Sequence, residues 1–144
     1  MNKREQMLEI LKDTRDYYKE DPDNRRSIDD DGNCNYTWGE NHCAVGRYLK
    51  PEFQREQWSS NNDSVNQLCE EYEDASAYGI DWVLRDEVHG IDVDFWMQLQ
   101  DFHDNRHNWI TKKTASGTQL PGISDNGKCE YVAIEDKITG GSYD

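Results

Sequence analysis

The sequence predicts a compact, mainly α-helical domain with a small β-hairpin component. Apolar and aromatic residues recur every three or four positions in several segments, as they do in helices that bury one face. Only 34% of the 144 residues are apolar, but five Trp and eight Tyr supply large buried areas. This length is typical of one domain with a real core. We therefore expect a single domain over 1–144, in which about 115–144 form a hairpin or a flexible tail.

The N-terminal segment carries the first helical pattern. Met7, Leu8, Leu11 and Tyr18 share one face, which predicts a helix over 3–19. The Asp21-Pro22 pair ends this helix, because the residue before proline disfavours the helical conformation. Next to it, the polar run 23–33 predicts a loop and 34–38 a short strand.

The middle of the chain predicts several short helices. The first covers 42–49, and the next covers about 51–58, with Pro51 well placed in its first turn. A third begins after Ser64, which forms a capping-box pattern with Gln67. A fourth covers 81–89, and Gly90 ends it.

The clearest helix begins after Asp92, a residue type that caps helices. Its apolar side is a single stripe that reaches residue 110 and includes two polar residues, His103 and Arg106. The stripe consists of Phe95, Trp96, Leu99, Phe102, His103, Arg106, Trp109 and Ile110. Farther along, Asp125-Asn126-Gly127 is typical of a hairpin turn, with a strand over Cys129–Ile134.

Negative charge is concentrated in one segment. Between Asp63 and Asp104 there are 12 acidic residues and one basic residue, Arg85, so this segment carries −11 of the chain's −14. Such a field repels nucleic acid and anionic membranes and attracts basic protein surfaces. Either the carboxylates are only solvated, or they imitate the closely spaced charges of a nucleic acid. Carboxylates on successive helical turns, about 5.4 Å apart, approximate such a row.

Cysteine and histidine residues offer a second hypothesis. A thiol at the start of the 42–49 helix would have a lowered pKa, and His103 or His42 could act as its base. Asp104 lies about 100° from His103 around a helix, which argues against a simple triad of Cys43, His103 and Asp104. Cys34 and Cys43 are too far apart in sequence for a zinc knuckle. The sequence therefore predicts no metal and no cofactor, and a zinc-stabilised scaffold is only a second alternative.

Two motifs together resemble a known group. Cys34-Asn-Tyr36 precedes Cys43-Ala-Val-Gly, and Leu99-Gln100-x-x-His103-Asp104 follows. This order is similar to that in small uncharacterised proteins of bacteriophages and prophages, over roughly 27–110. The resemblance implies a phage origin and no particular activity. The chain departs from that group after Thr114, where a Gly-rich tail replaces a short helical ending.

Together, these observations favour a phage-encoded, non-enzymatic protein that binds and inhibits a host protein with a basic surface. Its target would be a defence or nucleic-acid-processing factor. We expect no direct nucleic-acid binding and, without an apolar run of about 20 residues or a signal peptide, a cytoplasmic location. A small cysteine-dependent enzyme that uses Cys43 and His103 is the alternative. The predicted partner-binding residues are Glu70, Glu71, Glu73, Asp74, Asp81, Asp86, Glu87, Asp92 and Asp94. The oligomeric state stays open.

Overall fold

The computed structural model describes residues 2–20, 22–25, 37–38, 41–51, 81, 83–110 and 122–143. Within them the chain is mainly α-helical with small antiparallel hairpin pairings, as the sequence predicts. The main elements are α1 (Lys3–Glu20), α2 (Pro22–Arg25), β1 (Thr37–Trp38), β2 (Asn41–His42), α5 (Val93–Asp104), β3 (Trp109–Ile110), β4 (Gly122–Ile123) and α6 (Asp125–Thr139). Short 3₁₀ helices span Gly46–Tyr48, Asp86–Val88 and Arg106–Asn108. The helices predicted over 51–58 and after Ser64 lie outside the described residues, apart from Pro51.

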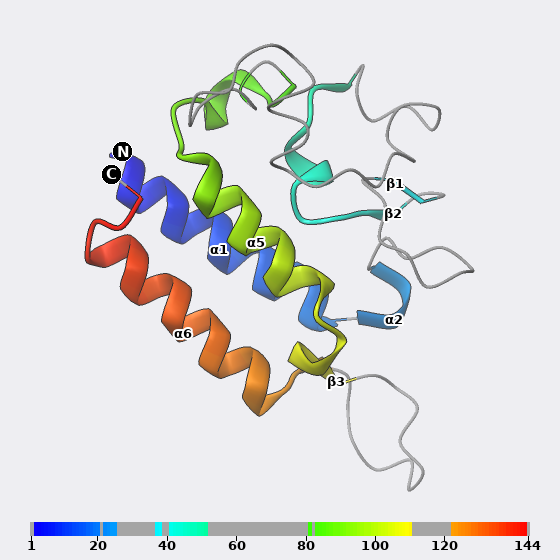
Figure 1. Ribbon diagram of the computed structural model, residues 1–144. Coiled ribbons are helices and arrows are strands. Elements are labelled where there is room, and N and C mark those ends of the chain that lie inside the picture. The colour runs from blue at the N-terminus through cyan, green and yellow to red at the C-terminus, as the bar shows by residue number, and fades with distance from the viewer. Residues whose placement is uncertain are drawn as a thin grey trace, which may run out of the picture.

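Three long helices form the frame of the domain. In Figure 1, α1, α5 and α6 lie side by side, and α6 runs antiparallel to the other two. The Arg4 side chain donates to the carbonyl of Thr139 across 3.4 Å, which ties the start of α1 to the end of α6. Segments 43–51 and 83–92 lie on the opposite side of α5 from α6. No helix in the described ranges is both long and apolar enough to cross a membrane.

The core lies where the apolar faces of these helices meet. The central residues of the α5 stripe are fully buried, in agreement with the periodicity of the sequence. The buried residues of α1, α5 and α6 are Met7, Ile10, Leu11, Thr14, Tyr18, Phe95, Trp96, Leu99, Phe102, His103, Gly127, Tyr131, Ile134 and Ile138. Two strand pairs lie at the edge of this frame: Thr37 pairs with His42, and Trp109 pairs with Ile123.

Helix α1 confirms the predicted N-terminal helix, but a second short helix follows it where a loop was predicted. Pro22 begins α2, so residues up to Arg25 are helical although 23–33 was predicted to be a loop. Proline suits the first turn of a helix, because the N–H that it lacks would have no partner there. Strand β1 covers Thr37–Trp38 of the predicted 34–38 strand, and the rest of that range lies outside the described residues.

The prediction of a helix over 81–89 is wrong. Leu84 instead forms a bridge with Leu49, and the N–H groups of Lys50 and Arg85 donate to Val83 and Tyr48. The buried residues Val83 and Leu84 therefore belong to a segment that pairs with its neighbour, and only Asp86–Val88 form a short 3₁₀ helix. The segment then turns at Gly90, whose φ of 80° is readily adopted only by glycine.

Helix α5 ends six residues earlier than the apolar stripe predicts. Its last carbonyls are satisfied by side chains: Asn108 Nδ2 donates to Phe102 O at 2.9 Å, and Trp109 Nε1 donates to His103 O at 3.0 Å. Helix termini require such partners. Trp109 is therefore buried in β3 rather than on a helix, whereas Arg106, predicted on the buried stripe, is exposed.

The predicted hairpin at 125–127 and the predicted strand over Cys129–Ile134 are both wrong, because α6 occupies this region. The Ser124 hydroxyl caps the helix by accepting from the N–H of Gly127 at 3.1 Å. Gly127 is needed for close packing rather than for a turn. A Cβ at this position would overlap the carbonyl oxygen of Asn108 and lie 2.7 Å from Ile123 Cγ1.

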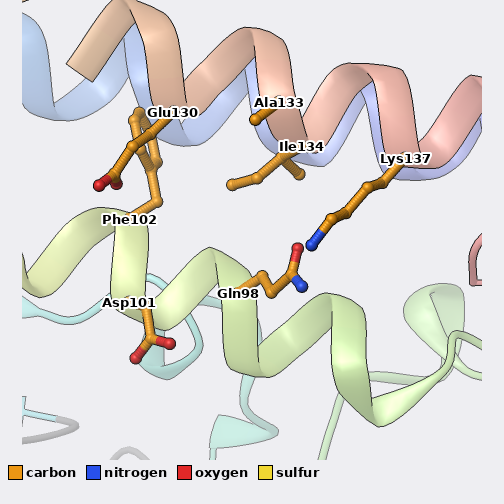
Figure 2. A pocket seen from close by; sticks show the side chains of 7 residues that line it. All are labelled: Gln98, Asp101, Phe102, Glu130, Ala133, Ile134 and Lys137. Atoms are coloured by element: carbon orange, nitrogen blue, oxygen red, sulfur yellow. The ribbon is translucent and has the colours of Figure 1, made fainter. Parts of the chain in front are cut away.

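A groove of about 240 Å³ separates α5 from α6 on their solvent side (Figure 2). Apolar atoms of Phe102, Ala133 and Ile134 line its middle, with polar side chains toward both ends. The C-terminal segment packs against α5. The Tyr143 hydroxyl donates to Gln98, and the ring centres of Tyr143 and Phe95 lie 5.7 Å apart.

Replacing Gly127 with alanine tests the close contact between α6 and Asn108. A Gly→Ala change in a helix interior normally stabilises by about 1 kcal/mol, and Gly127 lies in the first turn of α6, where a smaller gain would be the ordinary result. Here we expect Gly127→Ala to lower the free energy of unfolding, because the methyl group meets backbone atoms that cannot rotate away. Urea unfolding measures the effect. Gly122→Ala is the matched control, since a Cβ there meets nothing within 4 Å; a more stable Gly127→Ala protein would contradict the packing.

Asn108 provides a second test of the junction. Asn108→Ala removes the donor to Phe102 O and to Glu130, which should cost about 1–3 kcal/mol. Asn108→Asp should cost more, because it brings a second carboxylate beside Glu130 Oε2, which lies 2.6 Å from Asn108 Nδ2. The measurement is urea unfolding at neutral pH, with Asn126→Ala as the milder comparison. Equal stability of Asn108→Asp and the wild type would rule out this role.

Candidate functional sites

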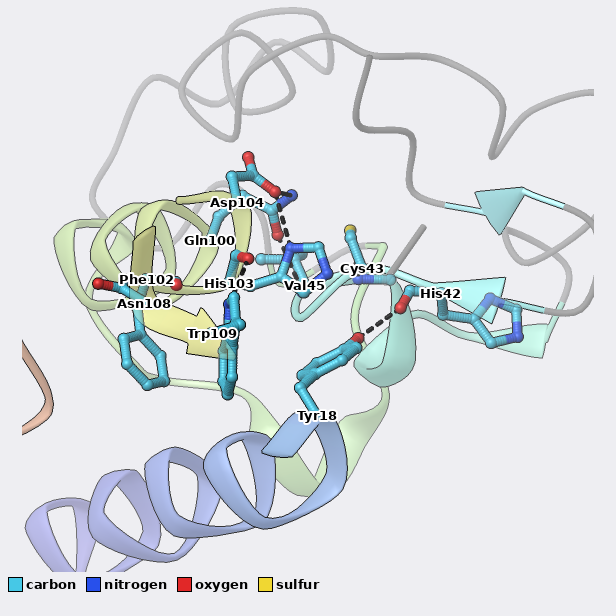
Figure 3. Close-up of polar contacts among 11 residues, drawn as sticks. Tyr18, His42, Cys43, Val45, Gln100, Phe102, His103, Asp104, Asn108 and Trp109 are labelled. Atoms are coloured by element: carbon cyan, nitrogen blue, oxygen red, sulfur yellow. Dashed lines mark hydrogen bonds and ion pairs between the residues drawn. The ribbon is translucent and has the colours of Figure 1, made fainter. Parts of the chain in front are cut away.

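Cys43, His103 and Asp104 lie in one polar cluster between α1, α5 and the segment that follows β2. In Figure 3 the imidazole of His103 points toward Cys43, and its other side meets Asp104. His103 Nδ1 lies 2.7 Å from Asp104 Oδ1. An ionised carboxylate only accepts hydrogen bonds, so Nδ1 of His103 is the donor in this contact. The sequence analysis argued from angular spacing against a simple triad, but the side chains of His103 and Asp104 do contact each other.

The angle between the two side chains explains how the pair forms. His103 is fully buried, whereas the Asp104 side chain keeps 34% of its surface exposed. Thus Asp104 does not face the core squarely, in line with the 100° separation, yet its carboxylate still reaches back to the ring. Gln100 Nε2 lies 3.4 Å from the same oxygen, and Gln100 Oε1 accepts from the N–H of Val45. The cluster therefore joins α5 to the segment after β2.

Tyr18 connects the cluster to α1. Its ring packs edge-on against His103 with the ring centres 4.5 Å apart, and its hydroxyl donates to the carbonyl of His42. Burial raises the pKa of Tyr18 well above its ordinary value, and Cys43 adds to the rise. The phenol therefore remains neutral and acts as a hydrogen-bond donor.

The thiol of Cys43 has the opposite character to that of a catalytic cysteine. Predicted at a helix start, it instead precedes a turn and a 3₁₀ helix, and Sγ accepts from the N–H of Gly46 at 3.2 Å. Cys43 is fully buried. Burial is the main cause that raises its pKa to about 12, with the Asp104 charge adding to the rise. Reactive thiols need a lowered pKa and access to solvent. In this conformation the thiol is therefore a packed core group.

The predicted acidic surface can be followed in part. Glu70, Glu71, Glu73 and Asp74 lie outside the described residues. Two of the remaining five predicted acids have structural roles: Asp81 Oδ2 accepts from the N–H of Gly90 at 2.8 Å, and Asp92 caps α5 by accepting from the N–H of Asp94.

Asp86, Glu87 and Asp94 are the predicted partner-binding acids that face solvent in the described ranges. The Asp86 side chain is 89% exposed and lies 3.8 Å from His89 Nε2. The single base of the segment, Arg85, is held by a hydrogen bond of 3.1 Å from its Nε to the carbonyl of Leu49. These three carboxylates are therefore available to a partner.

Glu130 is an acid that the sequence analysis did not single out. It extends from α6 toward the end of α5, where its carboxylate accepts from Asn108 and, at 3.3 Å, from Asn105. Burial raises the pKa of Asp101, and the charges of Asp104 and Glu130 raise it further. Two helices thus bring negative charge to one end of the groove, with Glu130 between the helices and Asp101 on the side of α5 away from α6. A helical pattern through Tyr131, Ile134 and Ile138, with Ser124 as its cap, would have placed Glu130 correctly.

No metal centre is evident among the described residues, in which no three His, Cys, Asp or Glu side chains are grouped to hold an ion. No protein-family model, curated protein or solved structure matches the chain. The site geometry therefore stands without a relative to guide it.

The burial of Cys43 leads to a test of its reactivity. We expect iodoacetamide at pH 7–8 to modify the exposed Cys129 and to leave Cys43 unmodified until the protein unfolds. Peptide mass spectrometry gives both rates in one sample. Burial raises the pKa of Cys43 from its ordinary value of 9.0 to about 12, so the stability that this group contributes is complete below pH 9 and falls as pH rises toward 12. Cys43→Ala should lose part of that dependence.

Rapid modification of Cys43 in the folded protein at pH 7 would contradict this assignment. It would return the cysteine-dependent enzyme to consideration, with the His103–Asp104 pair as its base.

Proposed function

We propose that this chain is a phage-encoded, cytoplasmic protein that binds a basic site on a host protein and blocks it. The observation that carries the proposal is the concentration of −11 of the total −14 charge between Asp63 and Asp104. A host defence or nucleic-acid-processing factor is the class of target that such a surface suits. The basic site of such a factor normally binds a polyanion, and the release of counterions favours that binding.

The exposed acids support the proposal in the described part of the segment. Asp86, Glu87 and Asp94 present carboxylates to solvent, and Arg85 is engaged by a backbone carbonyl. Long-range attraction between opposite charges raises association rates and falls steeply with salt. Inhibition would follow from occlusion of the basic site, without chemistry on the target.

The alternative enzyme is less well supported. The His103–Asp104 contact has the form of an oriented base, but its presumed nucleophile is fully buried and protonated. Catalysis would need a conformational change that exposes Cys43, whereas the binding function needs only the exposed acids.

A pull-down from nuclease-treated host lysate tests the proposal. We expect one stoichiometric protein, bound by the wild type and lost with Asp86→Lys/Glu87→Lys or with reversal of Glu70, Glu73 and Asp74. The matched control is Glu9→Lys/Asp136→Lys, which changes the net charge by the same amount as the first variant at exposed positions outside the segment. It should keep most of the binding.

The salt dependence of that complex is the second measurement. Between about 0.1 M and about 1 M salt the screening length falls from about 10 Å to about 3 Å, so affinity should fall by at least about tenfold. Binding that is insensitive to salt, or that survives both charge reversals, would overturn the proposed mechanism.

A further inference from the structure

The groove between α5 and α6 has an apolar middle and two ends of opposite character. Figure 2 shows Glu130 between the helices at one end, with Asp101 nearby on the side of α5 away from α6, and Lys137 with Gln98 at the other end. Phe102, Ala133 and Ile134 lie between them. A ligand that fits must therefore place apolar atoms in the middle and a positive charge at the Glu130 end.

The negative end has carboxylates whose charge is not offset. In the described structure, no hydrogen bond or ion pair engages the Asp101 carboxylate, which lies at the outer edge of α5 and is directed away from α6. Glu130 accepts two amide hydrogen bonds, and a carboxylate has about four acceptor positions. The raised pKa of Asp101 has burial as its main cause and repulsion from Asp104 and Glu130 as the next. A cation at this end would relieve that repulsion.

The size of the groove limits what can bind there. Its volume of about 240 Å³ lies below the roughly 300–1,000 Å³ of typical small-molecule pockets. One long side chain fits this scale. A lysine or arginine stem lies readily on an apolar surface while its charged head remains at the edge. Arginine matches a carboxylate better than lysine, because its planar head donates in a fork.

We propose that the α5–α6 groove binds one arginine side chain of the partner protein. The methylene stem packs on Phe102, Ala133 and Ile134, and the guanidinium pairs with Glu130 at the edge of α5, where the charge of Asp101 adds to the attraction. The positive charge of Lys137 disfavours a cation at the other end of the groove, so the arginine lies with its guanidinium at the Glu130 end. This inference rests on the proposed function, and it extends the binding surface from the acidic segment onto α6, where the sequence analysis placed no site.

Titration of the isotope-labelled protein with N-acetyl-arginine amide, followed by NMR, tests the groove directly. We expect saturable shifts at residues 98–102 and 130–137, and binding weaker by about tenfold or more for N-acetyl-citrulline amide, the neutral analogue of similar shape. Ala133→Leu, which fills the groove, should abolish the saturable shifts, and Asp101→Asn should weaken binding. Asp136→Asn removes a carboxylate from an exposed position of α6 outside the groove and should leave binding unchanged.

Equal binding of the citrulline analogue, or shifts that do not saturate and spread over all exposed acids, would overturn the arginine site. The host complex separates this result from the proposed function. If the host protein is lost with Asp86→Lys/Glu87→Lys but binds Ala133→Leu with unchanged affinity, the groove proposal fails and the acidic inhibitor stands. If the arginine probe saturates the groove but no host protein is enriched, the groove stands and the inhibitor proposal fails.

Discussion

The buried amide of Asn108 is the constraint that joins the two halves of this structure. Its Nδ2 donates to Phe102 O and to Glu130, and its Oδ1 accepts from Asn126 at 2.7 Å. Its main-chain carbonyl accepts from the N–H of Ser124. One fully buried side chain therefore ends α5 and positions the start of α6. Unsatisfied polar groups at this depth are costly, so the arrangement tolerates little variation. The groove between the two helices, and the position of Glu130 at its end, follow from this junction.

A second polar cluster fixes α5 to the other side of the domain. Tyr18, His103, Asp104 and Gln100 connect α1, α5 and the chain around Cys43 through ring packing and hydrogen bonds. The residue types resemble those of a cysteine hydrolase, but burial reverses the chemistry of the thiol. A group that would need to ionise is held neutral, and the cluster serves to orient the packing of three segments. By contrast, the carboxylates of Asp86, Glu87 and Asp94 remain in water, where charge acts on partners at a distance.

Periodicity and caps in the sequence were sufficient for the two main helices of the first and central segments. The stripe of α1 and the Asp92 cap of α5 were identified correctly, because both helices bury a single continuous face. The errors arise at positions where tertiary contacts, and not local sequence, determine the structure. Apolar residues at 109–110 continue the helical spacing by coincidence, since they lie on strand β3, from which Trp109 is buried. Asp125-Asn126-Gly127 looks like a turn, yet its glycine serves the close approach of α6 to Asn108, which local sequence does not reveal. For the site, the exposed acids and the cluster members were named, but not the role of each.

The sequence by itself determined the helical class, the burial of the Leu99 stripe and the concentration of charge between Asp63 and Asp104, because these depend on residue type and local spacing. Only the tertiary structure decided which acids are structural and which face solvent, since Asp81 and Asp92 accept from backbone N–H groups and are partly buried, whereas Asp86 is exposed. It also decided that Cys43 is a buried core thiol, because its raised pKa is caused mainly by burial among residues far away in sequence. The α5–α6 groove likewise exists only in the folded chain, since its two lining helices are separated by a junction that Asn108 holds together.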